Sequence, residues 1–308
     1  RYFEQVLDRV PDYAPALFEH ADAYVHMLDH AAWGIEGPVA AEPGVDALAQ
    51  AVSDLTAAAD NARNFDERAA IEFDLAIINS DLRGVQSRVQ RHLQLEGCES
   101  PNWIDPLATI FGYAEALEKR MEAIRRCDPM APIRAFSQSR AALWAGEPER
   151  ALDIAREARE TLSHPWLDIA VTRALLAMGQ FETARNEMSL HRKDEFLAAF
   201  AEIVHAAAGG ERERAYELRQ AFLQRSEVSD FERLQIHAMV GDRQEANAAA
   251  ARVDQRAPMS ISLMLATLWC HCGAPFDLEV TPQFAAKLSE GDLPWPPRSP
   301  ITFPLKDW

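Results

Sequence analysis

A six-residue phrase, which begins with glycine and ends with alanine, recurs through the second half of the chain. Copies of it begin at Gly146, Gly179, Gly210 and Gly241, and a fifth copy, ending in leucine, begins at Gly273. Successive glycines are 33, 31, 31 and 32 residues apart. A constant period of this size is typical of repeat proteins, in which each unit packs only against its neighbours.

The residue types in the phrase fit a turn between two helices. Glycine tolerates the left-handed backbone that ends a helix, where a Cβ atom would clash. Acidic residues directly after it suit the first turn of the next helix, near the positive end of the helix dipole. The small alanine lets two helix axes approach closely. Each period is therefore predicted to form a hairpin of two antiparallel helices.

This pattern resembles the tetratricopeptide repeat (TPR) family. The stretch that begins at Pro11 adds to the resemblance, because a large Leu17, a small Ala21 and an aromatic Tyr24 follow the proline at helical spacing. The Thr-Pro-Leu-His phrase of ankyrin repeats, which have a similar period, is absent from the sequence. The resemblance implies an all-α fold, a right-handed α-solenoid of about eight antiparallel helix hairpins.

The repeats are expected to cover residues 1–292, with a loop insertion at about 31–44, where glycine and proline gather. Residues 293–308 differ, because five prolines in 16 residues exclude a helix and favour extended geometry. This tail is also too apolar for a disordered linker, so we expect it to pack on the solenoid. The chain starts at Arg1 with the apparent second helix of a hairpin, which predicts a piece of a longer protein.

Helix boundaries follow from the turn glycines and from proline. An early hairpin is predicted over 66–96 with its turn at Gly84. Residues 104–128 fit either a compressed hairpin or one long helix, because Gly112 comes three residues early. Later helices are predicted at 133–145 with 148–162, 166–178 with 181–190, 195–208 with 211–225, 229–240 with 243–256, and 259–272 with a short partner at 283–290.

The charge of the chain argues against nucleic-acid binding. The formal net charge is −17 with a pI near 5.0, and no basic stripe is visible. Residues 1–60 hold eleven acidic and two basic residues. This imbalance indicates a solvated acidic face or, as the alternative, a docking patch for a basic partner.

The cysteine pattern and the hydropathy predict a cytoplasmic protein. The four cysteines are scattered except for Cys270 and Cys272, which does not look like a disulfide framework. No apolar run reaches the 18 residues that a membrane span requires. No signal peptide is visible at the start of the sequence.

Candidate metal and catalytic groups are few, and each has a simpler structural interpretation. Cys270 and Cys272 point about 200° apart on a helix, which favours core thiols over a metal site. His26 and His30 lie four residues apart, but they fit surface histidines better than metal ligands. The phosphate-binding and nucleophile motifs of enzymes are absent. We expect neither catalysis nor a metal or cofactor.

The TPR resemblance implies a concave groove, lined by the first helix of each hairpin, that binds peptides. The apolar residues predicted to line this groove could instead belong to the core, because periodicity does not distinguish groove positions from core positions. Two arginines in the predicted set suit a peptide carboxylate. The Lys/Asn carboxylate clamp of chaperone-binding members is not matched. The predicted groove residues are Phe18, Asp22, Phe136, Arg140, Leu143, Ile169, Arg173, Phe200, Phe231 and Gln235.

The aromatic residues of the tail are expected to fill apolar pockets on the solenoid. Trp295, Phe303 and Trp308 carry this expectation, and the last repeat, whose second helix is short, needs a cover. The tail either caps that repeat or occupies the groove, a mode that proline-rich segments also use.

These features together predict a binding protein. The expected function is a non-catalytic scaffold that presents a concave surface to a protein or peptide, with neither nucleic acid nor membrane as partner. Assembly as a homodimer is left open. The alternative is the sensor or regulatory region of a larger protein, a transcription regulator or cyclase, whose output domain lies upstream of Arg1.

Overall fold

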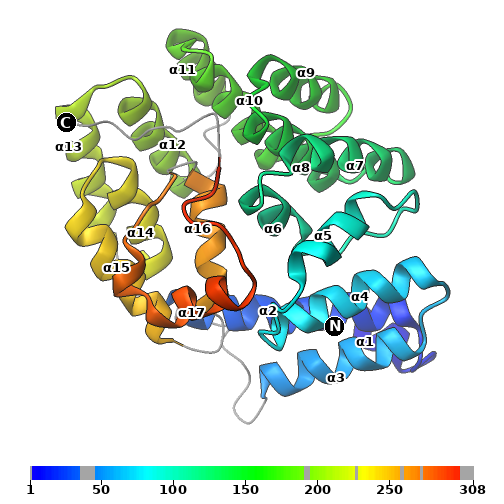
Figure 1. Cartoon of the computed structure of the whole chain (residues 1–308). Coiled ribbons are helices and arrows are strands. Elements are labelled where there is room, and N and C mark those ends of the chain that lie inside the picture. Colours follow the sequence, from blue (N-terminus) through cyan, green and yellow to red (C-terminus); the bar gives the residue numbers. More distant parts are fainter. Residues whose placement is uncertain are drawn as a thin grey trace.

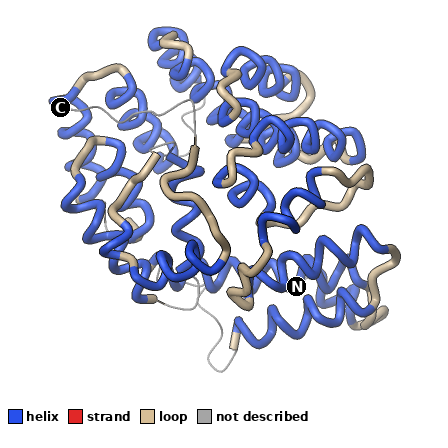
Figure 2. Tube along the Cα trace, viewed as in Figure 1, coloured by secondary structure: helices blue, strands red, loops and turns tan. Residues whose placement is uncertain are grey.

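The computed structural model describes residues 2–34, 46–190, 195–225, 228–256, 260–270 and 273–298. Within these ranges every regular element is a helix, and no strand occurs (Figure 2). The first half of the described chain contains α1 (Tyr2–Leu7), α2 (Ala14–Trp33), α3 (Ala47–Asp60), α4 (Phe65–Ile78), α5 (Val85–Leu93), α6 (Ile104–Ile110), α7 (Ala114–Cys127) and α8 (Pro132–Trp144).

The second half begins with helices that match the predicted boundaries between 133 and 256 to within three residues. Two short 3₁₀ helices, η1 and η2, flank α16. The elements are α9 (Pro148–Arg159), α10 (Pro165–Ala177), α11 (Phe181–Leu190), α12 (Glu195–Ala208), α13 (Arg212–Leu223), α14 (Asp230–Met239), α15 (Arg243–Gln255), η1 (Ser260–Ser262), α16 (Leu263–Cys270), η2 (Leu278–Val280) and α17 (Pro282–Glu290).

The recurrent phrase forms the same turn each time. The five glycines have backbone φ angles between +66° and +87°, the left-handed region in which glycine avoids a Cβ clash. The four alanines of the phrase are at most 1% exposed, because each lies between the two helices of its hairpin. They are Ala151, Ala184, Ala215 and Ala246.

Local signals in the sequence explain where several helices begin. A capping box starts α14, in which Ser229 Oγ accepts a hydrogen bond from the backbone N–H of Glu232 at 3.1 Å. The Glu232 carboxylate in turn accepts from the Ser229 N–H at 2.7 Å. Proline, which needs no backbone donor at this position, is the first residue of α8, α9, α10 and α17.

The structure decides one alternative that the sequence left open and moves one predicted loop boundary. Residues 104–128 form a compressed hairpin. Helix α6 ends at Ile110, Gly112 turns the chain with φ +80°, and α7 begins two residues later at Ala114. The loop predicted at 31–44 begins later, since α2 continues to Trp33 and ends on Gly34 in the left-handed conformation. Most of that predicted loop, residues 35–44, lies outside the described residues.

A disulfide joins Cys98 to Cys127, and the expectation that the scattered cysteines form none was wrong. The link between α5 and α6 passes beside the end of α7, which brings the two Cα atoms within 5.9 Å. Arg120 on α7 fixes this link by donating hydrogen bonds to the carbonyl oxygens of Gly97 and Glu99. Disulfides are typical of oxidising compartments, so the cysteines do not support a cytoplasmic location.

Reduction of this disulfide is expected to destabilise the protein by about 2–4 kcal/mol, because the bond closes a loop over a separation of 29 residues. Thermal unfolding followed by circular dichroism, with and without dithiothreitol, measures the effect. The double variant Cys98→Ser, Cys127→Ser should melt at the temperature of the reduced protein and be insensitive to reductant. An identical melt for oxidised and reduced wild-type protein would contradict the expectation.

The helices follow one another around an arc, and the two ends of the arc meet (Figure 1). Helix α2 packs against α15 and η1. The ring of Trp33 stacks on Phe231 with centroids 4.3 Å apart, and its Nε1–H donates to Ser262 Oγ at 3.2 Å. At the other contact, Lys287 Nζ on α17 donates to the Ser80 carbonyl oxygen at 2.9 Å. Helices α15, η1 and α17 therefore pack against the N-terminal part of the described chain.

Helix α16 lies inside the arc rather than on its rim (Figure 1). It packs against α6 on one side and α14 on the other. Most buried apolar side chains form one cluster that runs from α2 to Leu293. A smaller cluster lies between α12, α13 and α14. The interior of the arc is therefore largely occupied by the chain itself.

Candidate functional site

The predicted groove residues are buried or half-buried, and none of the ten is fully exposed. The half-buried ones are Phe18, Asp22, Arg140, Ile169 and Phe200. The buried ones, between 2% and 7% exposed, are Phe136, Leu143, Arg173, Phe231 and Gln235. The apolar row thus belongs in large part to the core, the alternative that the periodicity left open.

The structure brings Phe136 and Arg140 of α8 close to Arg173 of α10. Arg140 Nη2 donates to the Asp105 carboxylate at 2.6 Å, with each side chain 11% exposed. The Arg140 guanidinium also lies over the Phe136 ring, 4.9 Å from its centroid. The ring of Trp166 follows 5.8 Å from Phe136. These contacts fix the direction of the Arg140 fork.

Arg173 occupies the same position in its hairpin as Arg140 in the preceding one, six residues before the turn glycine. Burial, followed by the positive charge of Arg140, lowers the pKa of Arg173 to about 9. A carboxylate near both guanidinium groups would favour their charged forms. The two arginines are therefore suited chemically to an anionic group, a role that Asp105 fills for Arg140.

Asp105 is not among the residues predicted from the sequence, because it belongs to no recognisable motif. It lies on α6, in the stretch where the sequence allowed two different helix arrangements, so its partner was not predictable. A long-range ion pair of this kind has no periodic signature. The one local signal is its place in the first turn of α6, where a carboxylate is favoured by the helix dipole.

Other predicted residues lie elsewhere. Phe231 stacks on Trp33 at the contact that closes the arc. Phe200 packs edge-on against Phe222 of α13, with centroids 6.4 Å apart. Asp22 on α2 accepts from the Asn102 side chain at 3.3 Å. These residues do not join the Arg140 and Arg173 cluster.

The first tail aromatic packs on the last helices. The ring of Trp295 lies 5.1 Å from Phe276 and 5.2 Å from Phe284, measured between centroids. Beyond it, Arg298 lies near the Gly112 turn, where a Cβ atom added to the glycine would be 3.9 Å from the Arg298 Cβ atom. Phe303 and Trp308 lie outside the described residues.

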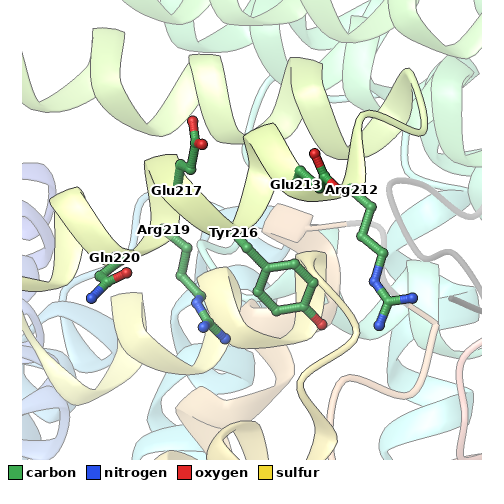
Figure 3. Close-up of a pocket in the computed structure, with 6 residues that line it drawn as sticks. All are labelled: Arg212, Glu213, Tyr216, Glu217, Arg219 and Gln220. Atoms are coloured by element: carbon green, nitrogen blue, oxygen red, sulfur yellow. The ribbon is translucent and has the colours of Figure 1, made fainter.

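A second surface feature, not foreseen from the sequence, lies on α13. Six residues of this helix line an open hollow of about 510 Å³: Arg212, Glu213, Tyr216, Glu217, Arg219 and Gln220 (Figure 3). Tyr216 lies between the two arginines, whose guanidinium carbons are 5.8 Å and 4.6 Å from its ring centroid. In the sequence, the Arg-x-x-x-Tyr-x-x-Arg spacing indicates that these three side chains lie on one side of a helix.

Across the described ranges, no group of three His, Cys, Asp or Glu side chains could hold a metal ion. The rings of His26 and His30 are 6.5 Å apart, and His26 pairs with Asp22 at 3.3 Å. Of the helices in the described part, none is both long and apolar enough to cross a bilayer.

One buried carboxyl should make stability depend on pH. Burial raises the pKa of Asp29, on α2, from 3.8 to about 7. The folded protein therefore holds this proton while the unfolded chain releases it, and stability falls as pH rises from about 4 to 7. Between pH 5 and pH 7 the loss should be about 2 kcal/mol.

Urea unfolding at pH 5, 6 and 7 measures this loss. The near-isosteric change Asp29→Asn removes this titrating group and should reduce the slope, and the slope that remains includes Asp74, whose pKa burial also raises to about 7. The matched change Asp12→Asn, at an exposed position, should leave the wild-type slope. An unchanged slope in the Asp29→Asn protein would show that other groups cause the pH dependence.

Comparison with known proteins gives no family for this chain. No family model matches it, and no curated protein matches it.

Proposed function

We propose that the chain is a TPR-like right-handed α-solenoid that acts as a non-catalytic scaffold for a protein or peptide partner. The repeated turn supports the family resemblance, because the same glycine conformation and the same buried alanine recur at each period. The short last helix α17 and the packed Trp295 fit a terminal repeat that needs a cover.

The observation that carries the binding proposal is the pair Arg140 and Arg173. They hold the same position in successive hairpins, and Asp105 and the Phe136 ring orient the first of them. Arg140 already donates to the Asp105 carboxylate, so a ligand carboxylate would share the two guanidinium groups with Asp105, and the half-buried Ile169 supplies apolar surface beside them. The proposed ligand is therefore a peptide segment that carries a carboxylate.

A peptide library displayed on phage tests this proposal without knowledge of the partner. Selected peptides are then bound to protein that carries a photo-crosslinking amino acid at Ile169, which is half-buried beside Arg173, or at the exposed Glu182 on α11. We expect enriched peptides that crosslink from position 169 and not from position 182. No enrichment, or equal crosslinking from both positions, would refute the proposal.

A further inference from the structure

Helix α1 carries apolar side chains that are largely open to solvent. It packs against α2 at the N-terminal edge of the arc, yet none of its residues is buried (Figure 1). Leu7 reaches the core cluster, whereas Tyr2 and Phe3 are 78% and 37% exposed. The helical turn continues past Leu7, because the Val10 N–H donates to the Val6 carbonyl oxygen at 2.9 Å. Val10, on this extra turn, is 47% exposed.

These side chains form a stripe with helical spacing. Tyr2, Val6 and Val10 are four residues apart and therefore lie along one side of the helix. The Phe3 ring lies beside Tyr2, with centroids 6.5 Å apart, and Tyr13 at the start of α2 is 44% exposed. Of the eight large apolar side chains that are exposed in the described part of the chain, four thus fall within residues 2–13. Exposed apolar side chains that gather in this way mark a contact surface, whereas single ones need no explanation.

The charges around the stripe are mainly negative. Residues 2–13 carry three carboxylates and one cation, all exposed: Glu4, Asp8, Asp12 and Arg9. Arg63, in the link that precedes α4, does not offset them, because it pairs with Glu67 at 2.7 Å. The same sign dominates further along, since residues 1–60 hold eleven acidic and two basic residues. The local field therefore favours a cationic partner.

We propose that the α1 stripe, formed by Tyr2, Phe3, Val6, Val10 and Tyr13, binds a cationic amphipathic helix of a partner protein. The apolar side chains of that helix pack along the stripe, and its lysines or arginines face the carboxylates beside it. A second copy of this chain fits less well, because it would bring two acidic surfaces together. The α1 stripe lies on a different helix from the arginine pair of the proposed peptide site and does not depend on it.

The probe is a fluorescein-labelled peptide of leucine and lysine whose leucines recur at helical spacing. Fluorescence anisotropy is followed at about 0.15 M salt, which screens the general attraction of the acidic protein for cations. Wild-type protein should bind the peptide. The double variant Tyr2→Ser, Phe3→Ser should weaken binding at least about tenfold, because it removes two aromatic anchors. Asp8→Lys with Asp12→Lys should weaken it by a similar factor, because the local charge is reversed.

Two matched double variants, far from α1 in the sequence, serve as controls. Met130→Ser with Ile133→Ser removes two exposed apolar side chains at the start of α8. Asp153→Lys with Glu160→Lys makes the same charge change at exposed positions of α9 and its C-terminal end. Each should leave the dissociation constant within about twofold. Circular dichroism melts verify that every variant is folded.

The proposal fails if wild-type protein does not bind the leucine and lysine peptide, or if it binds a leucine and glutamate peptide of the same pattern as tightly. It also fails if the control variants weaken binding as much as the stripe variants, since the attraction would then be general. Size exclusion with light scattering tests the other occupant. A dimer that the Tyr2→Ser, Phe3→Ser variant dissociates would assign the α1 stripe to a second copy of the chain.

Discussion

Replacing Asp105 with alanine is expected to lower the free energy of unfolding by about 3–5 kcal/mol. The Asp105 carboxylate contacts Arg140 at 2.6 Å, and both side chains are 11% exposed. Loss of the carboxylate leaves the guanidinium charge in a site with little water, and the second guanidinium of Arg173 adds repulsion. Urea unfolding at pH 7 measures the change.

Two comparisons separate this effect from a general loss of charge. Asp81→Ala removes a carboxylate from an exposed ion pair with Arg83, and it should change stability far less. The double change Asp105→Leu with Arg140→Met replaces the buried pair with apolar side chains and should recover much of the loss. Equal destabilisation by Asp81→Ala and Asp105→Ala would contradict the assigned role of burial.

Replacing Phe284 with alanine should cost about 3–5 kcal/mol, the range for a large aromatic removed from a close-packed core. Phe284 on α17 is fully buried, between Phe276 at 5.8 Å and Trp295 at 5.2 Å. Asp254 also accepts hydrogen bonds from the first backbone N–H groups of α17, which keeps the helix in place. Thermal and urea unfolding both report the loss.

The same variant should loosen the segment after α17, because Trp295 loses a ring that it packs against. Trypsin should then cleave after Arg298 faster than in wild-type protein. Phe65→Ala, at a phenylalanine that is 67% exposed, is the control and should alter neither stability nor cleavage appreciably. A Phe284→Ala protein with the wild-type melt and cleavage rate would show that α17 contributes little to the core.

The helix hairpins could be predicted because their determinants are local. A turn glycine, a close-contact alanine and a proline at a helix start each determine the structure of the few residues around them. Each therefore recurs in the sequence at a fixed spacing. Gly112 shows the limit of this reasoning. It lies off the regular period, and only the structure decides that the chain turns there.

The rest depends on contacts between distant residues, which no short pattern encodes. The Cys98–Cys127 disulfide joins residues 29 apart, and Trp33 reaches Ser262 across 229 residues. Whether a predicted groove residue is exposed likewise depends on which other helix crosses it. The position of α16 inside the arc could not be predicted from periodicity.

The contact between the first and last helices changes how the protein should unfold. An open row of repeats frays from its ends, because a terminal repeat has only one neighbour. Here α2 is held by α15 and η1, and α17 by the turn after α4. Neither terminal unit can detach without breaking contacts of the other. The described helices therefore form one cooperative unit, closer to a globular domain than to a linear chain of independent repeats.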